Sequence, residues 1–346
     1  MLRTTTSGVL KSYRYNLNST SRTLNKARDT VLTGRNFNSF SEDPATAARC
    51  FQLRRSLQRA DSQYTIGQSV VSKYQVAWDT LNSVVDEVSN AVGDSALASI
   101  LSGANDASGG GRTTMGEQLT QLAESISRTM NVKYGDNFVF AGADGLNTPF
   151  VFDAETNTLT YRGLDVTNGD MDALNYLANE EKKYADLGLG ITEGNDGSVI
   201  DTSAFNTALQ GITFLGYGKD EDGDPKNVVC IINRMGQLLK GCDEGGNFAS
   251  GEEEAEFKRL FSKFETASAS LTNKHVELDA RAAFLNSNQA QLENTTYSLQ
   301  EQIIGMEDVD QADAITAYSW AQYCYNAALK VGNSILSESL MDYLRT

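Results

Sequence analysis

The sequence has only three prolines in 346 residues, so long helices can run without interruption. It also has no apolar run near the ~20 residues that a membrane-spanning helix needs, so we expect no membrane span. Residues Met1 to Tyr15 lack the apolar core of a secretory signal peptide. Basic residues are outnumbered 29 to 45, and the net charge of −16 argues against nucleic acid as a partner.

Residues that often carry catalysis are scarce. His275 is the only histidine; it lies on a predicted helical seam, and no His-Glu-x-x-His zinc motif is present. The glycines at 109–111 lack the Lys-Ser/Thr pair and the preceding strand of a phosphate-binding loop. We therefore expect no enzyme: no catalytic residue, no cofactor-binding residue and no cofactor are predicted.

Metal-binding patterns are also incomplete. Asp220, Asp222 and Asp224 have the spacing that opens a calcium loop, but Pro225 replaces the required glycine and Ile231 cannot act as the twelfth-position ligand. The four cysteines lack the short spacing of metal sites. We expect them to be small buried hydrophobes, with a Cys230–Cys242 disulfide as the alternative. The cysteines are Cys50, Cys230, Cys242 and Cys324.

A long apolar seam dominates the first third of the chain. Its steps alternate four and three residues, which is the 3.5-residue spacing of a coiled coil or a long helical bundle. Ser41 is the expected N-cap, Pro44 is tolerated in the first turn, and Gly93 is the expected stop. A helix over residues 43–93 would be roughly 75 Å long, which predicts a rod. The seam consists of Leu53, Leu57, Ala60, Tyr64, Gly67, Val71, Tyr74, Trp78, Leu81, Val85, Val88 and Val92.

Three further helices complete the predicted rod. A second long seam begins at Glu252, matches the first in length and is expected to lie antiparallel to it. Shorter seams at 7–33 and 312–343 flank the long ones, and a helix as weak as the first of these is marginal alone in water. We expect both terminal helices to be mobile in the monomer and to pair in an assembly; the alternative is that they extend an intramolecular bundle. The predicted assembly residues are Leu10, Tyr13, Leu17, Leu24, Val31, Ile315, Tyr318, Tyr325, Leu329, Leu336, Leu340 and Tyr343.

The middle of the chain changes character. A small-residue stretch after Gly93, which ends in the glycines 109–111, predicts a turn or short loop before a helix over about 115–130. Alternating phenylalanines then predict a β-hairpin with residues 154–157 at its tip. Residues 164–250 predict short strands, turns and one clear helix over 228–239. The predicted fold class is mainly α, an elongated rod of long antiparallel helices with a β-hairpin and a small α+β domain at the far end.

This pattern predicts three domains. Residues 1–40 and 305–346 form terminal helices for axial polymerisation, residues 41–163 and 250–304 form the helical rod with its hairpin, and residues 164–249 form an inserted outer domain. Charge supports the pairing of the two ends. Residues 1–60 carry eleven basic and three acidic side chains, whereas residues 300–346 carry two basic and seven acidic ones. The nineteen acids against six bases in residues 164–256 predict a solvated surface.

Several local motifs resemble the flagellin superfamily, and within it the hook-associated protein 3 family. Thr33-Gly34-Arg35, followed by Ser41-Glu42-Asp43-Pro44-Ala45, is similar to the stretch that joins the terminal helix to the rod. Asn137-Phe138-Val139-Phe140-Ala141-Gly142 and Thr148-Pro149-Phe150 resemble the hairpin of that family, and Ser339-Leu340-Met341-Asp342-Tyr343-Leu344 resembles its tail. The resemblance covers residues 1–163 and 250–346; the four cysteines and Glu42 depart from the family pattern.

The resemblance implies a structural component of the bacterial flagellum. Such a protein is exported unfolded by the flagellar type III system, without a cleaved signal peptide, to an extracellular location. It assembles with itself as a ring between the hook-side junction protein and flagellin, and an export chaperone covers its C-terminal helix. The alternatives are flagellin itself, the bulk filament subunit, and a cytoplasmic coiled-coil scaffold unrelated to flagella.

Overall fold

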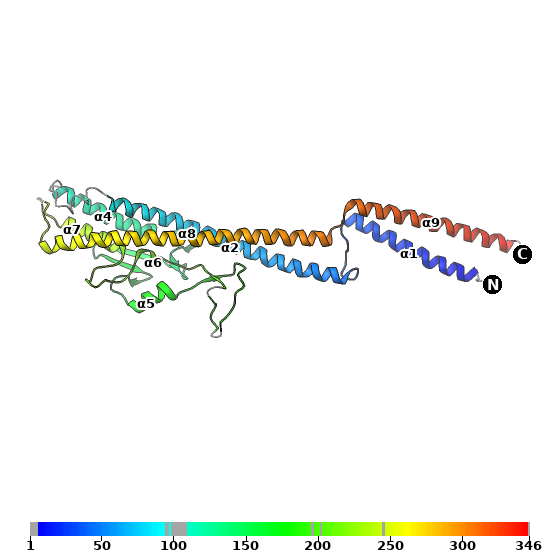
Figure 1. Cartoon of the computed structure of the whole chain (residues 1–346), viewed down its shortest axis with the longest axis horizontal. Helices are drawn as coiled ribbons and strands as arrows, with labels where there is room; N and C mark the ends of the chain where they lie inside the picture. Colours follow the sequence, from blue (N-terminus) through cyan, green and yellow to red (C-terminus); the bar gives the residue numbers. More distant parts are fainter. Residues whose placement is uncertain are drawn as a thin grey trace. The chain divides into compact units, whose positions relative to one another are not determined.

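The structure is a computed structural model of the chain. It describes residues 6–93, 97, 109–194, 197–200, 203–243 and 246–344, with the side chains of 6–7, 109–110 and 335–344 outside the description. The chain divides into two compact units. We call residues 62–292 the central unit, and residues 1–61 with 293–346 the terminal unit (Figure 1).

The two longest helices are antiparallel. Helix α2 (Pro44–Val92) has 49 residues and helix α8 (Gly251–Glu307) has 57. Within the central unit, the rings of Trp78 and His275 lie 5.2 Å apart, and Gln289 Nε2 donates to the Tyr64 carbonyl at 3.1 Å. Positions that rise along one helix therefore meet positions that fall along the other, as the two seams predict.

Both ends of helix α2 follow from local chemistry. Its cap is Asp43 rather than the predicted Ser41, since Asp43 Oδ1 accepts from the backbone N–H of Thr46 at 3.1 Å. Hydrogen bonds from Thr46 lower the pKa of Asp43. Pro44 occupies the first helical position, where its missing N–H costs nothing. The helix ends at Val92, and Gly93 donates to the Ser89 carbonyl.

Gly67, the one gap in the α2 seam, has a structural reason. A Cβ atom there would lie 2.5 Å from Gln289 Oε1 and 3.6 Å from the Leu187 side chain. Because Gly67 has no side chain, Gln289 of α8 and Leu187 can both pack against this point of α2. Leu187 belongs to residues 164–249, which we call the inserted segment. Leu187 is buried at this point.

Helices α4 (Gly109–Thr129) and α7 (Val228–Lys240) pack closely in the central unit. A Cβ atom at Gly116 would lie 2.6 Å from the Gly236 carbonyl, and one at Gly236 would lie 2.7 Å from the Gly116 carbonyl. Two glycines thus let the two backbones approach each other. Helix α7 lies where the sequence predicts it, between a cap at Asn227 and Gly241. The predicted loop is wrong at its end, because the glycines 109–111 form the first turn of α4. Residues 94–96 and 98–108 of that predicted loop lie outside the described residues.

Small sheets fill the middle of the chain. The predicted hairpin is confirmed: β4 (Phe150–Asp153) pairs antiparallel with β5 (Thr158–Tyr161), and β6 (Leu164–Asp165) extends this sheet. The other antiparallel pairs are β1 (Lys133–Tyr134) with β2 (Asn137–Phe138), β3 (Ala141–Gly142) with β9 (Leu209–Gln210), and β7 (Tyr184–Ala185) with β8 (Phe205–Asn206). Short helical turns lie between them: α5 (Met171–Asn175), η1 (Tyr176–Glu180) and α6 (Gly211–Leu215).

The core of the central unit is large and aromatic. Tyr74, Phe140, Phe150, Tyr161 and Phe264 are among its fully buried side chains. The phenols keep their polar ends bonded: the hydroxyl of Tyr161 donates to the Phe140 carbonyl at 3.0 Å, and that of Tyr74 donates to the Asn206 carbonyl at 3.2 Å. Burial raises the pKa of Tyr74 to about 12.

The terminal unit contains helices α1 (Thr6–Thr33) and α9 (Gln311–Leu344), with the ends of α2 and α8. Among the described residues, no helix is long and apolar enough to span a membrane. All four cysteines are free, with Cys50 and Cys230 buried and the other two partly buried. Long antiparallel helix pairs with small sheets inserted mid-chain confirm the predicted fold class; the three-domain division stays a prediction.

Candidate assembly surface

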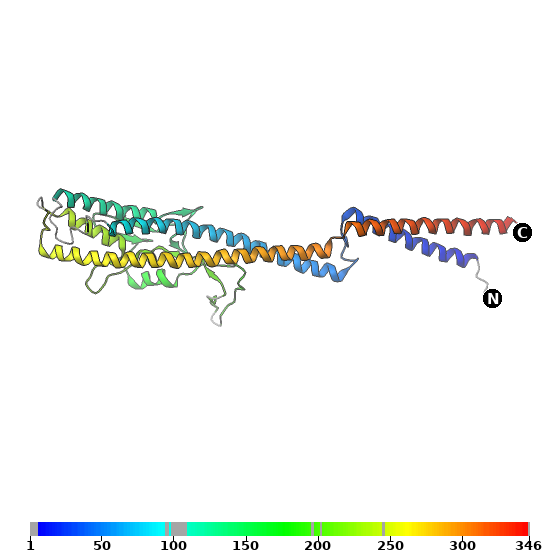
Figure 2. The same ribbon diagram turned by 45° about the horizontal axis from the view of Figure 1, so that its top comes forward.

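Helices α1 and α9 lie side by side in both ribbon views (Figures 1 and 2). On α1, the half-buried residues recur every three or four positions, as the sequence predicts for an amphipathic helix. They form a single stripe, and the rest of the helix is exposed. The half-buried apolar residues of α1 are Leu10, Tyr13, Leu17, Leu24, Ala27 and Val31.

The matching seam on α9 is made of small residues. Ala314, Ala321 and Ala328 stand seven residues apart, and Gly332 continues the same face. Ala314 and Ala321 are buried, although each has only one methyl group to bury. A methyl group at Gly332 would overlap the Tyr13 hydroxyl, so the Tyr13 ring lies directly on the α9 backbone at this point. Small side chains therefore bring the two helices close together.

Backbone hydrogen bonds join the segments that lead into the pair. Gly34, with a φ of +68°, closes α1, and its carbonyl accepts from Val309 N at 3.0 Å. Asn36 N donates to the Glu307 carbonyl at 2.7 Å, and Asn36 Nδ2 donates to the Asp308 carbonyl at 3.0 Å. The chain entering the first long helix is thus hydrogen-bonded to the chain leaving the second.

One ion pair links helices α2 and α8 close to these backbone hydrogen bonds. Arg54 Nη2 of α2 donates to Glu307 Oε2 of α8 at 2.5 Å, and the Glu307 side chain is only 11% exposed. Within the described part of α1, Arg28 and Asp29 form a local ion pair at 3.4 Å. The ion pair between Arg54 and Glu307 is therefore one contact between the basic N-terminal region and the acidic C-terminal region. Helices α1 and α9, in contrast, contact each other through apolar and small side chains.

The outer surface of α9 is apolar and uncovered. Trp320 is 68% exposed and Tyr323 is 67% exposed, and their rings stack with centroids 5.9 Å apart. Val331 continues this face eight residues beyond Tyr323, and it too is exposed. Burying aromatic side chains of this size would be strongly favourable. A helix that is apolar on more than one face has room for a further partner besides α1.

The predicted assembly residues fall into three groups. Those of α1, namely Leu10, Tyr13, Leu17, Leu24 and Val31, are half-buried beside α9. On α9, Tyr318 and Tyr325 are half-buried, whereas Ile315 is 52% exposed and Leu329 is 42% exposed. Leu336, Leu340 and Tyr343 belong to helix α9, but their side chains lie outside the description. Their role in assembly stays a prediction.

The sequence reading missed two features of α9. It selected large apolar residues, so it overlooked the small-residue seam, although the seven-residue spacing of the alanines was a usable signal. It also overlooked Trp320, Tyr323 and Val331, which stand off the stripe that it followed. Both features were missed for the same reason. The sequence analysis predicts one apolar stripe on this helix, whereas α9 has two apolar faces.

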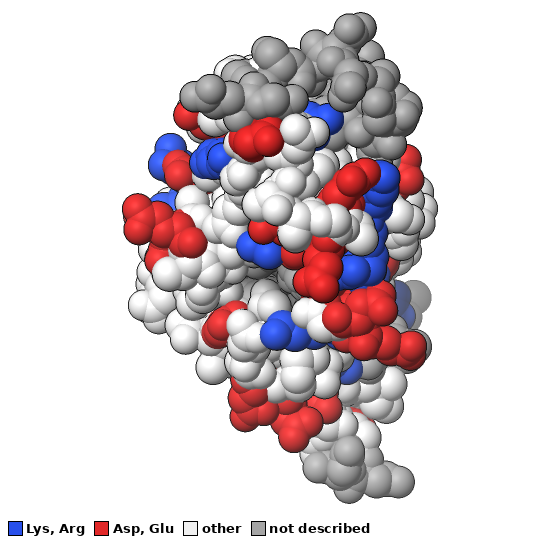
Figure 3. Space-filling view, turned by 90° about the vertical axis from the view of Figure 1, so that its left-hand side faces the viewer, with Lys and Arg blue, Asp and Glu red and all other residues white. Residues whose placement is uncertain are grey.

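The acidic triplet that resembles a calcium loop lies in the central unit. Lys263 Nζ of α8 is 2.5 Å from Asp220 Oδ2 and from Asp224 Oδ2, and Arg259 Nε is 2.6 Å from Asp224 Oδ2. Burial opposes the charge of Lys263, but the hydrogen bonds that its ammonium group donates to the carboxylates raise its pKa above the usual range. An ammonium group thus occupies the centre of this cluster. Figure 3 shows acidic and basic side chains interleaved on the face that it displays.

The comparisons with known proteins agree with the helical arrangement. Residues 6–144 match the family model of the bacterial flagellin N-terminal helical region. The chain therefore carries a flagellin-type N-terminal helical region, which confirms the resemblance predicted from the sequence motifs. No curated protein sequence matches the chain.

Solved structures with a similar course of the chain come from flagellar proteins. FlgL from Bacillus cereus is 13% identical, with 73% of this chain and 99% of that chain covered and a TM-score of 0.41. Flagellar hook-associated protein-3 from Legionella pneumophila is 12% identical, with 72% and 98% covered and a TM-score of 0.47. FlgL from Xanthomonas campestris is 12% identical, with 73% and 99% covered and a TM-score of 0.46.

Proposed function

We propose that this protein is a structural subunit of the bacterial flagellum that joins the hook side to the flagellin filament, as hook-associated protein 3 does. Helices α1 and α9 are its polymerisation helices. One observation carries the proposal: the terminal unit leaves large apolar side chains such as Trp320 and Tyr323 in water. The flagellin-type region at residues 6–144 and the hairpin and tail motifs supply the flagellar context.

The energetics favour assembly over an isolated helix pair. Burying one Leu-sized side chain contributes roughly 1.5–3 kcal/mol, and the exposed face of α9 holds several side chains of that size or larger. Neighbouring copies that pack on this face offset the cost of ordering two long helices. The proposed self-association is therefore a ring in which each copy covers the α9 face of the next.

Three other partners follow from this position. The hook-side junction protein contacts one side of the ring, and flagellin contacts the other. Before export, a cytoplasmic chaperone covers the apolar faces of α9 and keeps the chain from aggregating. The chain then passes through the flagellar type III system in unfolded form and acts outside the cell.

A genetic experiment tests the proposal. Cells that lack the gene should build hooks but release flagellin into the medium, and the wild-type gene should restore motility. A variant with Trp320→Glu and Tyr323→Glu should fail to restore it, because charged groups on the α9 face oppose packing. Tyr176→Glu is the matched control, since Tyr176 is also an exposed aromatic residue but lies in the central unit. Normal motility of the double variant would contradict the proposal.

Flagellin itself is the second candidate, because residues 6–144 match its N-terminal region. Copy number separates the two functions. A junction protein is a trace component of purified filaments, whereas flagellin is the dominant band on a gel. The third reading, a cytoplasmic scaffold, predicts that the protein stays inside the cell. Its appearance in the medium of a flagellar assembly mutant would count against that reading.

A further inference from the structure

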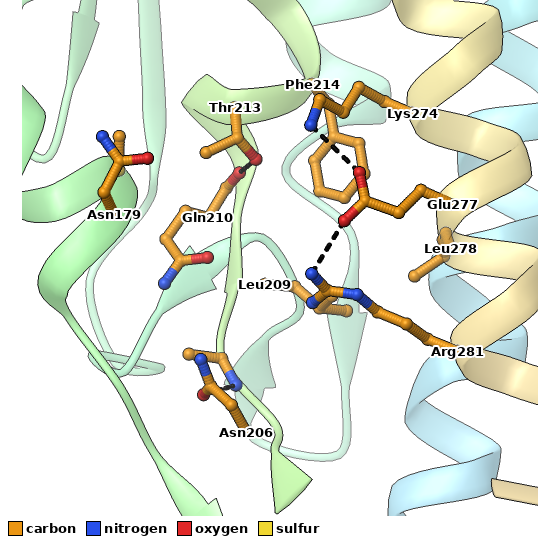
Figure 4. A pocket seen from close by; sticks show the side chains of 12 residues that line it. Asn179, Asn206, Leu209, Gln210, Thr213, Phe214, Lys274, Glu277, Leu278 and Arg281 are labelled. Atoms are coloured by element: carbon orange, nitrogen blue, oxygen red, sulfur yellow. Dashed lines mark hydrogen bonds and ion pairs between the residues drawn. The ribbon is translucent and has the colours of Figure 1, made fainter. Parts of the chain in front are cut away.

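The central unit contains a polar cavity that the assembly function does not use. It has a volume of about 260 Å³ and lies between helix α8 and the segment that carries β8, β9 and α6 (Figure 4). One wall consists of charged side chains of α8, and the opposite wall consists of side-chain amides and a hydroxyl. The residues that line it are Ala178, Asn179, Asn206, Ala208, Leu209, Gln210, Thr213, Phe214, Lys274, Glu277, Leu278 and Arg281.

The charged wall has a positive excess. Lys274 Nζ donates to Glu277 Oε2 at 3.0 Å, and Arg281 Nη2 donates to Glu277 Oε1 at 2.8 Å. Two cations thus share one carboxylate, and hydrogen bonds from Lys274 lead the effects that lower the pKa of Glu277. Together the ammonium and the guanidinium carry more donor hydrogens than this one carboxylate can accept. The wall can therefore bind an additional anion.

Further basic residues lie behind the opposite wall. Lys73 Nζ of α2 donates to the Thr207 carbonyl at 2.9 Å, next to the lining residue Asn206. Burial, with a further contribution from the charge of Lys183, lowers the pKa of Lys73 to about 8. The backbone N–H of Lys183 in turn donates to Asn206 Oδ1. Lys73 therefore adds positive charge near this cavity, in a chain whose net charge is −16.

The amide wall supplies hydrogen-bonding groups at the cavity surface. Asn179 comes from η1, Asn206 from β8 and Gln210 from β9, and their side chains line the cavity across from α8 (Figure 4). Their positions are fixed: Gln210 Nε2 donates to the Glu181 carbonyl at 2.6 Å, and Asn206 Oδ1 accepts from the backbone N–H of Ala208 at 3.0 Å. Pre-organised amides of this kind suit a ligand with several hydroxyl groups.

We propose that this cavity binds a small organic anion, a carboxylate-bearing compound with hydroxyl groups and about the size of one sugar ring. Its carboxylate pairs with Lys274 and Arg281 beside Glu277, and its hydroxyls bond to the amides of Asn179, Asn206 and Gln210. Charge-assisted hydrogen bonds supply most of the affinity. The side chains of Leu209, Phe214 and Leu278 contact the apolar parts of the ligand.

Ligand-observed NMR on the full chain tests the proposal with glucuronate and its neutral counterpart, glucose. Glucuronate should bind, and glucose should bind about tenfold more weakly or not at all, because it lacks the charge. Glucuronate affinity should also fall as salt is added. Equal binding of the two sugars, or no binding of glucuronate, would overturn the proposal. Acetate should bind more weakly than glucuronate; equal binding would contradict the role of the amides.

Substitutions in α8 test whether the ligand binds in this cavity. Lys274→Gln should weaken glucuronate binding about tenfold, and Glu277→Gln should strengthen it, because the competing carboxylate is gone. Both side chains are partly exposed, so neither change threatens the fold. Lys258→Gln is the matched control, since Lys258 also lies on α8 and pairs with a glutamate four residues away. Unchanged affinity in Lys274→Gln, or an equal loss in Lys258→Gln, would contradict the assignment.

Discussion

The central unit and the terminal unit share the same two long helices, but they bury different side chains. In the central unit, α2 and α8 bury tyrosine, phenylalanine and leucine against the inserted segment. In the described part of the terminal unit, the buried apolar side chains are Cys50, Ala60, Ala314 and Ala321, none larger than cysteine. Because the terminal unit buries so little apolar volume, we expect its stability to depend on partners.

The largest expected difference concerns core aromatics. Phe264→Ala in the central unit should lower the free energy of unfolding by about 3–5 kcal/mol, because it removes a fully buried ring and leaves a cavity. Phe51→Ala in the terminal unit should change it by less than about 0.5 kcal/mol, because that ring is mostly exposed. Urea unfolding of the monomer measures both. Similar losses in the two variants would contradict the contrast between the units.

Two glycines test the close approach of α1 and α9. Gly→Ala inside a helix normally stabilises it by about 0.5–1 kcal/mol. Gly305→Ala in α8 should show this gain, since a Cβ there meets nothing within 4 Å. Gly332→Ala should instead loosen the α1–α9 pair by about 1–3 kcal/mol, because the methyl group overlaps Tyr13.

Amide exchange in α1 and α9 measures the effect of Gly332→Ala, and far-ultraviolet circular dichroism measures the helix content. Adding Tyr13→Ala to Gly332→Ala should restore part of the loss, because the overlapping ring is removed. If Gly332→Ala slows exchange in α1, the close packing of Tyr13 on α9 is wrong.

A smaller effect depends on pH. Hydrogen bonds from Arg259, with a further contribution from Lys263, hold the pKa of Asp224 below its usual value in the folded state. The carboxylate therefore adds stability above the unfolded pKa of ~3.9, and this stability is lost as pH falls through the lower folded pKa. Asp224→Asn should cost about 1–2 kcal/mol at pH 7 and almost nothing at a pH below the lowered folded-state pKa of Asp224. A cost that is the same at both pH values would show that charge is not the cause.

The smallest expected effect lies at the start of α2. Asp43→Ala removes the cap that accepts from the Thr46 N–H, and the first turn of α2 should fray. Ser41→Ala should have no effect on α2, because the hydroxyl of Ser41 is hydrogen-bonded to Ser39 instead. Amide exchange at residues 45–47 separates the two variants. Faster exchange in Ser41→Ala alone would restore Ser41 as the cap.

Sequence periodicity predicted the elements better than their partners. The seams located α1, α2, α8 and α9, and the polar turn at 154–157 located the β4–β5 hairpin. An apolar seam shows which face of a helix is buried, but not which element covers it. The packing of α4 on α7 through Gly116 and Gly236 could therefore not be predicted from the sequence. The cavity beside Lys274 and Arg281 was equally hidden, because its two walls come from segments about seventy residues apart.

The most direct test of the account is amide hydrogen exchange on the soluble monomer and on the assembled protein. In the monomer, the amides of α1 and α9 should exchange far faster than those of α2 and α8 in the central unit, and assembly should slow them. Strong protection of both α1 and α9 in the monomer, unchanged by assembly, would contradict the claim that neighbouring copies complete the terminal unit.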